Sequence, residues 1–353
     1  MELIHSEGSM EMTPRERIMA ALKRQEPDRV PFCELGIDRA LAERLMGWPV
    51  TKTAAGGSLA KNPYTVEESK ALAAFLGFDC IWYLLRAPTF AHQGVGQEGR
   101  GFMGEGMIKS EADLEKIKLP DPTKEEFYRE AEHFAKNKGD YALVFATRIG
   151  FFQTVLSMGT ENFLVSLYTD RPLVEKILDL YFDWMTVVVE RMCQIGYDIF
   201  WTTDDYAYNT GMFFSPAIFR EIIAPRYRRV LNKCTIPWFL HSDGNIMESM
   251  DILVDLGVAA THPNQKGAMD IQEVKRRYGD RVCVIGNVDL NILGMGTPEE
   301  TDREVRELIR DLAPGGGYMI SSGNSLASYL KTDCVLAMSR AIQKYGKYPI
   351  RIS

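Results

Sequence analysis

The sequence predicts an α/β fold, a (β/α)8 TIM barrel, because short apolar segments alternate with helical segments along the chain. Eight segments have the continuous apolar character of parallel strands that are covered on both faces. They are residues 30–35, 80–85, 143–146, 199–202, 238–240, 258–260, 282–285 and 318–320. Eight such βα units in one chain of 353 residues indicate a closed barrel, and we expect residues 1–353 to form a single domain.

Helical segments precede, separate and follow the strands. A Thr-Pro start predicts an N-terminal helix over residues 13–22. Further helices are expected at 40–46, 66–76, 124–136, 152–168, 172–193, 216–232, 246–255, 271–278, 298–312 and 332–344. Residues 87–109, rich in glycine and aromatic residues, are expected to form a hairpin inserted over one end of the fold.

A doubly wound open sheet with a dinucleotide site is the competing fold. It requires a G-x-G-x-x-G turn between a strand and a helix. Gly94, Gly96 and Gly99 match the spacing, but the match begins well after the strand at 80–85 and no helix follows it. We therefore interpret this stretch as a flexible turn.

Composition narrows the range of partners. The net charge of −7 argues against nucleic acid and against an anionic membrane surface. No C-x-x-C pair occurs among the six cysteines, and no apolar run is long enough to span a membrane. The first twelve residues lack the character of a signal peptide, so a cytoplasmic protein is expected. The oligomeric state stays open, with a homodimer as one option.

Polar residues follow nearly every predicted strand. In a barrel the carboxyl ends of the strands meet at one mouth, where active sites lie. The residues at these ends are Arg86, Arg148, Asp204–Asp205, His241–Asp243, His262–Gln265, Asn287–Asp289 and Ser321–Asn324. We expect the active site to lie among them.

Several stretches resemble the uroporphyrinogen decarboxylase superfamily, which also contains zinc-dependent methyltransferases that serve corrinoid proteins. They are TPRERIMAALKRQEPDRVPF, SPAIFREIIAPRYRRV, FLHSDGNI, MDIQEVKRRYGDRVCVIGNVD and GYMISSGNSL. The resemblance covers nearly the whole chain and implies a (β/α)8 barrel. It is much less specific for the reaction.

Three departures argue against the decarboxylase branch. That branch has an arginine-bearing stretch after its first strand, where this chain reads CELGIDRA with Arg39 as its only arginine. Arg86 stands where the branch has a catalytic aspartate. Asn324 ends a Ser-Gly-Asn turn where the branch has a histidine.

The methyltransferase branch implies a zinc site. One of its subgroups has an H-x-C pattern, which here has become His241-Ser242-Asp243. Another subgroup, acting on aryl methyl ethers, resembles a set of two carboxylates and a histidine. Asp205, Glu221 and His241 match that order, with 15 and 19 residues between them, so they are the expected ligands. Asp243 is the first substitute should Glu221 point to solvent.

The remaining site residues are expected beside these ligands. Asp204 and Asp243 are the candidate catalytic carboxylates, and Arg86, Tyr206 and Asn324 are candidate substrate contacts. The resulting hypothesis is a zinc-dependent methyltransferase that moves a methyl group from a small substrate, with an aryl methyl ether as one candidate, to a separate corrinoid protein. The alternatives are a metal-free decarboxylase of related type and a non-catalytic ligand-binding barrel.

Overall fold

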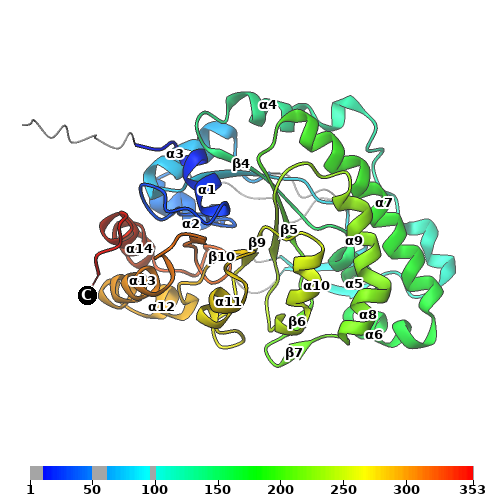
Figure 1. The fold of residues 1–353 in the computed structure, drawn as a ribbon. Helices are drawn as coiled ribbons and strands as arrows, with labels where there is room; N and C mark the ends of the chain where they lie inside the picture. Colours follow the sequence, from blue (N-terminus) through cyan, green and yellow to red (C-terminus); the bar gives the residue numbers. More distant parts are fainter. Residues whose placement is uncertain (1–10, 50–61, 96–100, 353) are drawn as a thin grey trace, which may run out of the picture.

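A curled parallel sheet of seven strands forms the centre of the protein in the computed structural model, which describes residues 11–49, 62–95 and 101–352 (Figure 1). In spatial order the strands are β1 (Cys80–Leu84), β4 (Ala142–Thr147), β5 (Ile199–Thr203), β8 (Trp238–His241), β9 (Ala260–His262), β10 (Cys283–Ile285) and β11 (Tyr318–Met319). All neighbouring pairs are parallel. The carboxyl ends of the strands therefore lie on the same side of the sheet.

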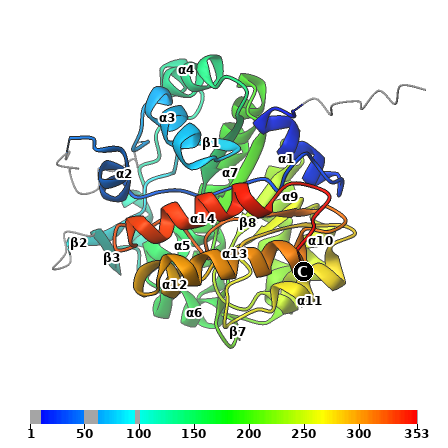
Figure 2. The same cartoon turned by 90° about the vertical axis from the view of Figure 1, so that its left-hand side faces the viewer.

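Helices cover the outside of the sheet. They are α1 (Pro14–Leu22), α2 (Arg39–Met46), α3 (Val66–Leu76), α4 (Arg129–Asn137), α5 (Phe151–Met158), α6 (Thr160–Thr169), α7 (Arg171–Ile195), α8 (Pro216–Ile218), α9 (Ala224–Leu231), α10 (Met250–Asp255), α11 (Ile271–Tyr278), α12 (Leu290–Met295), α13 (Pro298–Leu312) and α14 (Thr332–Tyr345). Figure 2 shows α13 and α14 running side by side across one face. No helix in the described part of the chain has both the length and the apolar character needed to cross a bilayer.

The strands are apolar because both of their faces are covered. Every residue of β4 and of β5 is buried. Phe145 of β4 stacks on Phe200 of β5 with ring centroids 5.5 Å apart, and Trp201 is fully buried against Phe239. This packing holds the carboxyl ends of neighbouring strands in fixed register, with Thr203 beside His241.

The first predicted strand, at residues 30–35, forms single bridges rather than a regular strand. Cys33 donates its amide to the Ile320 carbonyl (3.0 Å), and the Ile320 amide donates to the Pro31 carbonyl (2.9 Å). On the other side the Asp79 amide donates to the Phe32 carbonyl (2.9 Å). Pro31 has no N–H group and so interrupts a continuous ladder. The segment nevertheless bonds to both edges of the seven-stranded sheet.

The predicted helix at 152–168 is two helices, α5 and α6, separated by Gly159. Gly159 has a left-handed φ of +80°. The strand β3 packs so closely here that a Cβ atom on Gly106 would lie 2.2 Å from the Gly159 nitrogen. The chain must turn at this point, and glycine permits both the turn and the close approach.

The predicted helix at 216–232 is also interrupted. Ser215 caps its start through the Ile218 amide, but residues Phe219–Ile223 form a π-helical turn between α8 and α9. Pro225 cannot donate the hydrogen bond that a regular α-helix needs at this place. The wider turn accommodates that missing bond.

One strand boundary was displaced and one helix was missed. The strand expected at 258–260 is β9, which runs two residues later and ends at His262. The helix α12 was not predicted, because only six residues form it. Asp289 starts α12 by accepting the Asn291 amide (2.8 Å).

The inserted hairpin expected at 87–109 is confirmed as the antiparallel pair β2 (Ala91–Val95) and β3 (Gly101–Gly106). Gly94 belongs to β2, and the other two glycines of the rejected dinucleotide pattern lie outside the described residues. A second, smaller hairpin, β6 (Ala207–Tyr208) with β7 (Gly211–Met212), follows β5.

Candidate active site

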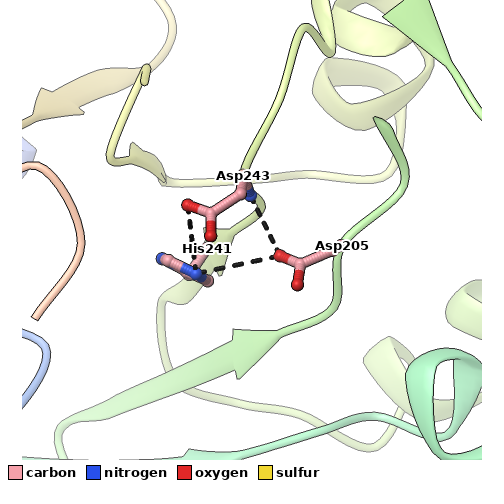
Figure 3. Close-up of side chains that lie close together, drawn as sticks. All are labelled: Asp205, His241 and Asp243. Atoms are coloured by element: carbon pink, nitrogen blue, oxygen red, sulfur yellow. Dashed lines mark hydrogen bonds and ion pairs between the residues drawn. The ribbon is translucent and has the colours of Figure 1, made fainter. Parts of the chain in front are cut away.

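Asp205, His241 and Asp243 form a cluster at the carboxyl ends of β5 and β8. Their side chains point toward one another (Figure 3). The Nε2 atom of His241 lies 3.8 Å from Oδ1 of Asp205 and 3.7 Å from Oδ1 of Asp243. Each of the three residues offers one potential metal-ligand atom, and these atoms all lie within 4.8 Å of one another. Among the described residues, no other group of three such residues converges in this way.

The cluster has the dimensions of a metal site. Ligand atoms bound at about 2.1 Å in tetrahedral geometry lie roughly 3.4 Å apart, so the two distances from Nε2 of His241 need only a small contraction. One imidazole nitrogen and two carboxylate oxygens form a donor set that suits zinc. Three protein ligands would leave a fourth position for substrate, as in catalytic zinc sites.

His262 holds the second ring nitrogen of His241. The two Nδ1 atoms lie 2.8 Å apart, and both rings are buried. Burial, together with His241, lowers the pKa of His262 well below its ordinary value, so the His262 ring is neutral. If His241 binds a metal through Nε2, its proton lies on Nδ1 and is donated to His262.

Backbone and amide groups fix the two carboxylates. The Asp243 amide donates to Oδ1 of Asp205 (2.9 Å). The side-chain amide of Asn324 donates to both carboxylate oxygens of Asp243 (3.0 and 2.7 Å). Burial raises the pKa of Asp243. These contacts hold the acids beside His241 and link the β8 end to the loop after β11.

A cavity of about 400 Å³ opens beside the cluster. Its polar lining includes the three cluster residues, Arg86, Arg148, Thr203 and Asn324, and its apolar lining includes Leu35, Ile37, Trp82, Leu84, Ala146 and Phe152. Pockets that bind small molecules combine an apolar wall with a few convergent polar groups in this way. The cavity therefore has the composition of a small-molecule site.

The comparisons with known proteins now identify the family. The family model described as uroporphyrinogen decarboxylase (URO-D) matches residues 96–345. The chain belongs to the uroporphyrinogen decarboxylase family. This confirms the resemblance drawn from the sequence motifs.

Relatives in the uroporphyrinogen decarboxylase family carry two kinds of name. A uroporphyrinogen decarboxylase from Methylococcus capsulatus is 25% identical over 267 residues, covering 70% of this chain and 73% of its own. A methylcobamide:CoM methyltransferase, MtbA, from Methanosarcina mazei is 22% identical over 324 residues, covering 85% and 89%. The solved structure of a methyltransferase from Methanosarcina mazei matches with a TM-score of 0.73 at 19% identity, over 95% of this chain and 99% of that one. That likeness supports the fold.

Two of the predicted substrate contacts lie at the cavity. Arg86 and Asn324 both line it, at the positions where the decarboxylase branch of the family was expected to differ. Arg86 donates from Nη2 to the Thr203 hydroxyl (3.3 Å). Burial, and then the neighbouring cation of Arg148, lower the pKa of Arg86 to about 9.

The placement predicted for Glu221 is wrong. Its side chain is 61% exposed on the outer surface and pairs with Arg171 at 2.7 Å. Glu221 lies in the π-helical turn whose buried face holds Phe219, Ile222 and Ile223. The second carboxylate of the cluster is Asp243 instead.

Asp204 and Tyr206 also lie away from the cavity. Asp204 is fully buried and accepts the amides of Ile149 and Phe152, both at 2.9 Å. Tyr206 is fully buried in an aromatic core, and its hydroxyl bonds to that of Tyr227. Asp204 was predicted to be catalytic and Tyr206 to contact the substrate. Both predictions are wrong about the position of the side chain, because both residues are buried and bond to other parts of the protein.

Two residues of the site were expected among the strand ends but were given no individual role from the sequence. Arg148 follows β4 as Arg86 follows β1, and this shared strand-end position was the available signal. His262 ends β9 in register with His241 on β8. The displaced strand boundary at residue 260 concealed that pairing.

Proposed function

We propose that this protein is a metal-dependent methyltransferase that removes a methyl group from a small methylated substrate and delivers it to a separate corrinoid protein. An aryl methyl ether is one candidate substrate, and zinc is the proposed metal. The observation that supports this most is the convergence of Asp205, His241 and Asp243 beside the cavity. The relative named a methylcobamide:CoM methyltransferase supports the corrinoid part of the proposal.

The protein's own residues would prepare the substrate for transfer. Asp205, His241 and Asp243 would hold the metal, with His262 and Asn324 fixing the orientation of the ligands. A zinc ion bound there would supply Lewis acidity, which draws charge from the substrate heteroatom that carries the methyl group. Trp82 and Phe152 in the cavity wall would exclude water and keep the methyl group oriented.

We also propose that the curled sheet is a closed (β/α)8 barrel. Residues 31–33 would occupy the eighth strand position, between β11 and β1. Their hydrogen bonds to Ile320 and Asp79 support this arrangement.

Metal content is the first test of the proposed function. Purified protein should contain about one zinc ion per chain by elemental analysis after dialysis against zinc. His241→Ala and Asp243→Ala should each lose most of that zinc, because each removes one of three ligands. Glu221→Ala is the matched control and should retain the metal, because Glu221 points to solvent.

Methyl transfer is the second measurement. Methylation of a reduced corrinoid protein, followed by its visible spectrum, should be lost in the two ligand variants and kept in Glu221→Ala. Full zinc occupancy in His241→Ala would refute the ligand assignment. If the metal-free wild-type protein decarboxylates a carboxylated substrate, the alternative of a metal-free decarboxylase is favoured.

A further inference from the structure

We propose that the cavity takes a substrate with a carboxylate group, held by Arg86 and Arg148 on the side of the metal cluster where β1 and β4 end. This inference rests on the proposed function in one respect, which is that the substrate carries a methyl group at the end that faces the metal cluster. It assigns the substrate class as a small methylated carboxylic acid.

The site is divided by charge in the order of the strands. Arg86 follows β1 and Arg148 follows β4, whereas Asp205 follows β5 and the pair His241 and Asp243 lies at the end of β8. These four strands are consecutive neighbours in the sheet. The strand ends that carry the arginines therefore lie next to those that carry the acids, with β4 and β5 roughly 4.8 Å apart.

The two arginines are incompletely paired within the protein. No ion pair between either guanidinium and a carboxylate occurs among the described residues, and Arg86 has a single hydrogen bond, to Thr203. The Nε atom of each arginine is also buried, and it has no hydrogen-bond partner among the described residues. Leaving such donors unsatisfied is costly, and an anionic ligand would satisfy them.

Nearby acids do not meet this need. Asp204 uses both carboxylate oxygens to accept backbone amides. Asp205 faces His241 and accepts the Asp243 amide. Together with Asp243, these acids carry one more charge than the two guanidiniums, so a bound divalent cation would leave an excess of one positive charge. One carboxylate on the substrate would balance it.

The shape of the cavity indicates a small ligand with an apolar body. A volume of about 400 Å³ lies near the lower end of the range for ligand sites. Trp82 and Leu84 flank the arginines along β1, and Arg148 lies over the ring of Phe152 at 5.1 Å. The planar guanidinium fork binds carboxylates through two hydrogen bonds, which gives both affinity and orientation.

Calorimetric titration of the full chain with 4-methoxybenzoate and with neutral methoxybenzene tests this inference. The wild type should bind the carboxylate at least tenfold more tightly than the neutral ether, and zinc loading should strengthen binding of the carboxylate more than binding of the ether. Arg86→Met and Arg148→Met should each weaken carboxylate binding about 10- to 100-fold, the range expected for a lost charged hydrogen bond. The affinity of Arg86→Lys for 4-methoxybenzoate should lie between those of the wild type and Arg86→Met, because lysine keeps the positive charge but cannot donate two parallel hydrogen bonds as a guanidinium does.

Arg276→Met is the matched control, because Arg276 is exposed on α11 and pairs only locally with Glu273. It should bind like the wild type. Equal wild-type affinity for the ether and the carboxylate would overturn the inference, and this comparison needs no variant. Unchanged carboxylate binding in both folded methionine variants, or tighter binding of inorganic phosphate than of 4-methoxybenzoate, would also overturn it.

The two proposals fail in different ways. Arginine-dependent binding of 4-methoxybenzoate without methyl transfer to a corrinoid protein would reject the proposed function and leave the carboxylate site established. Methyl transfer from methoxybenzene as fast as from 4-methoxybenzoate would support the function and reject the carboxylate site.

Discussion

Glu34 is a buried carboxylate at the edge of the site, and burial controls its protonation. It accepts the Ser322 amide (2.9 Å), the Ser322 hydroxyl (3.0 Å) and the Leu35 amide (3.0 Å). Desolvation outweighs these hydrogen bonds and raises its pKa from 4.5 to about 7. Glu34 therefore connects the loop after β11 to the segment that precedes α2 in a pH-dependent manner.

We expect Glu34 to lower the stability of the protein as pH rises. Between pH 4.5 and 7, Glu34 keeps its proton in the folded protein but has released it in the unfolded chain. The stability that protonated Glu34 provides at low pH is therefore lost as the pH rises through this interval. The loss should be roughly 3 kcal/mol. The free energies of unfolding of wild type and Glu34→Gln in urea, compared at pH 4.5 and pH 7.5, measure it. A difference between the two proteins that does not change with pH would contradict the assignment.

At the scale of residues, the sequence predicted two members of the cluster, Asp205 and His241, and offered Asp243 as a ligand only as a substitute for Glu221. His241 and Asp205 follow buried strands, and strand ends converge by topology. Glu221 lies on a helix, where the direction of a side chain depends on the rotation of that helix. The π-helical turn at Pro225 and the ion pair with Arg171 decide that direction, and neither is visible from spacing alone.

Asp204 shows how an element next to the site depends on a single buried acid. Its two oxygens accept the amides of Ile149 and Phe152, which lie at the start of α5. The first amides of a helix lack partners within the helix, so an acid placed there stabilises its start. Burial raises the pKa of Asp204 to about 6.

Replacing Asp204 should affect stability rather than metal binding. In Asp204→Asn the side chain has one acceptor oxygen for two buried amides, so the free energy of unfolding should fall by about 1–3 kcal/mol at pH 8. Zinc content should stay at the wild-type value. A variant with wild-type stability and lost methyl transfer would instead restore the catalytic role expected from the sequence.

Helices whose first and last turns carry typical capping residues could be predicted from the sequence. Helices whose limits are set by contacts with distant parts of the chain could not. Thr65 and Gly77 frame α3, whose predicted limits are confirmed. By contrast, the break between α5 and α6 depends on the approach of β3 to Gly159, a contact between distant parts of the chain. The helix α12 is too short for a periodic apolar pattern.

At the scale of the whole molecule, the alternation of strands and helices predicted the parallel order of the sheet. That order follows from connectivity, because each helix returns the chain to the next parallel strand. The closed barrel that the sequence predicted stays a proposal, because closure of the sheet depends on irregular residues near Pro31. A charged network holds those residues in place.

Asp79 is the centre of this network. Its carboxylate is fully buried and accepts the Phe32 amide (2.8 Å), Arg17 (2.6 Å) and both terminal nitrogens of Arg29 (2.8 Å each). Arg17 also bonds to Asp28 through two nitrogens. The network thus ties α1 and residues 28–32 to the start of β1.

Removing the charge of Asp79 should loosen the segment that we propose as the eighth strand. Asp79→Asn leaves Arg17 buried with one fewer counter-charge, and breaking a buried pair from one side costs about 3–5 kcal/mol. Hydrogen exchange at the amides of Cys33 and Ile320 should accelerate while exchange in β4 and β5 changes little. Glu273→Gln, which removes the exposed partner of Arg276, should change the free energy of unfolding by under about 1 kcal/mol. Wild-type exchange at Cys33 and Ile320 in folded Asp79→Asn would show that the segment is held by something other than this network.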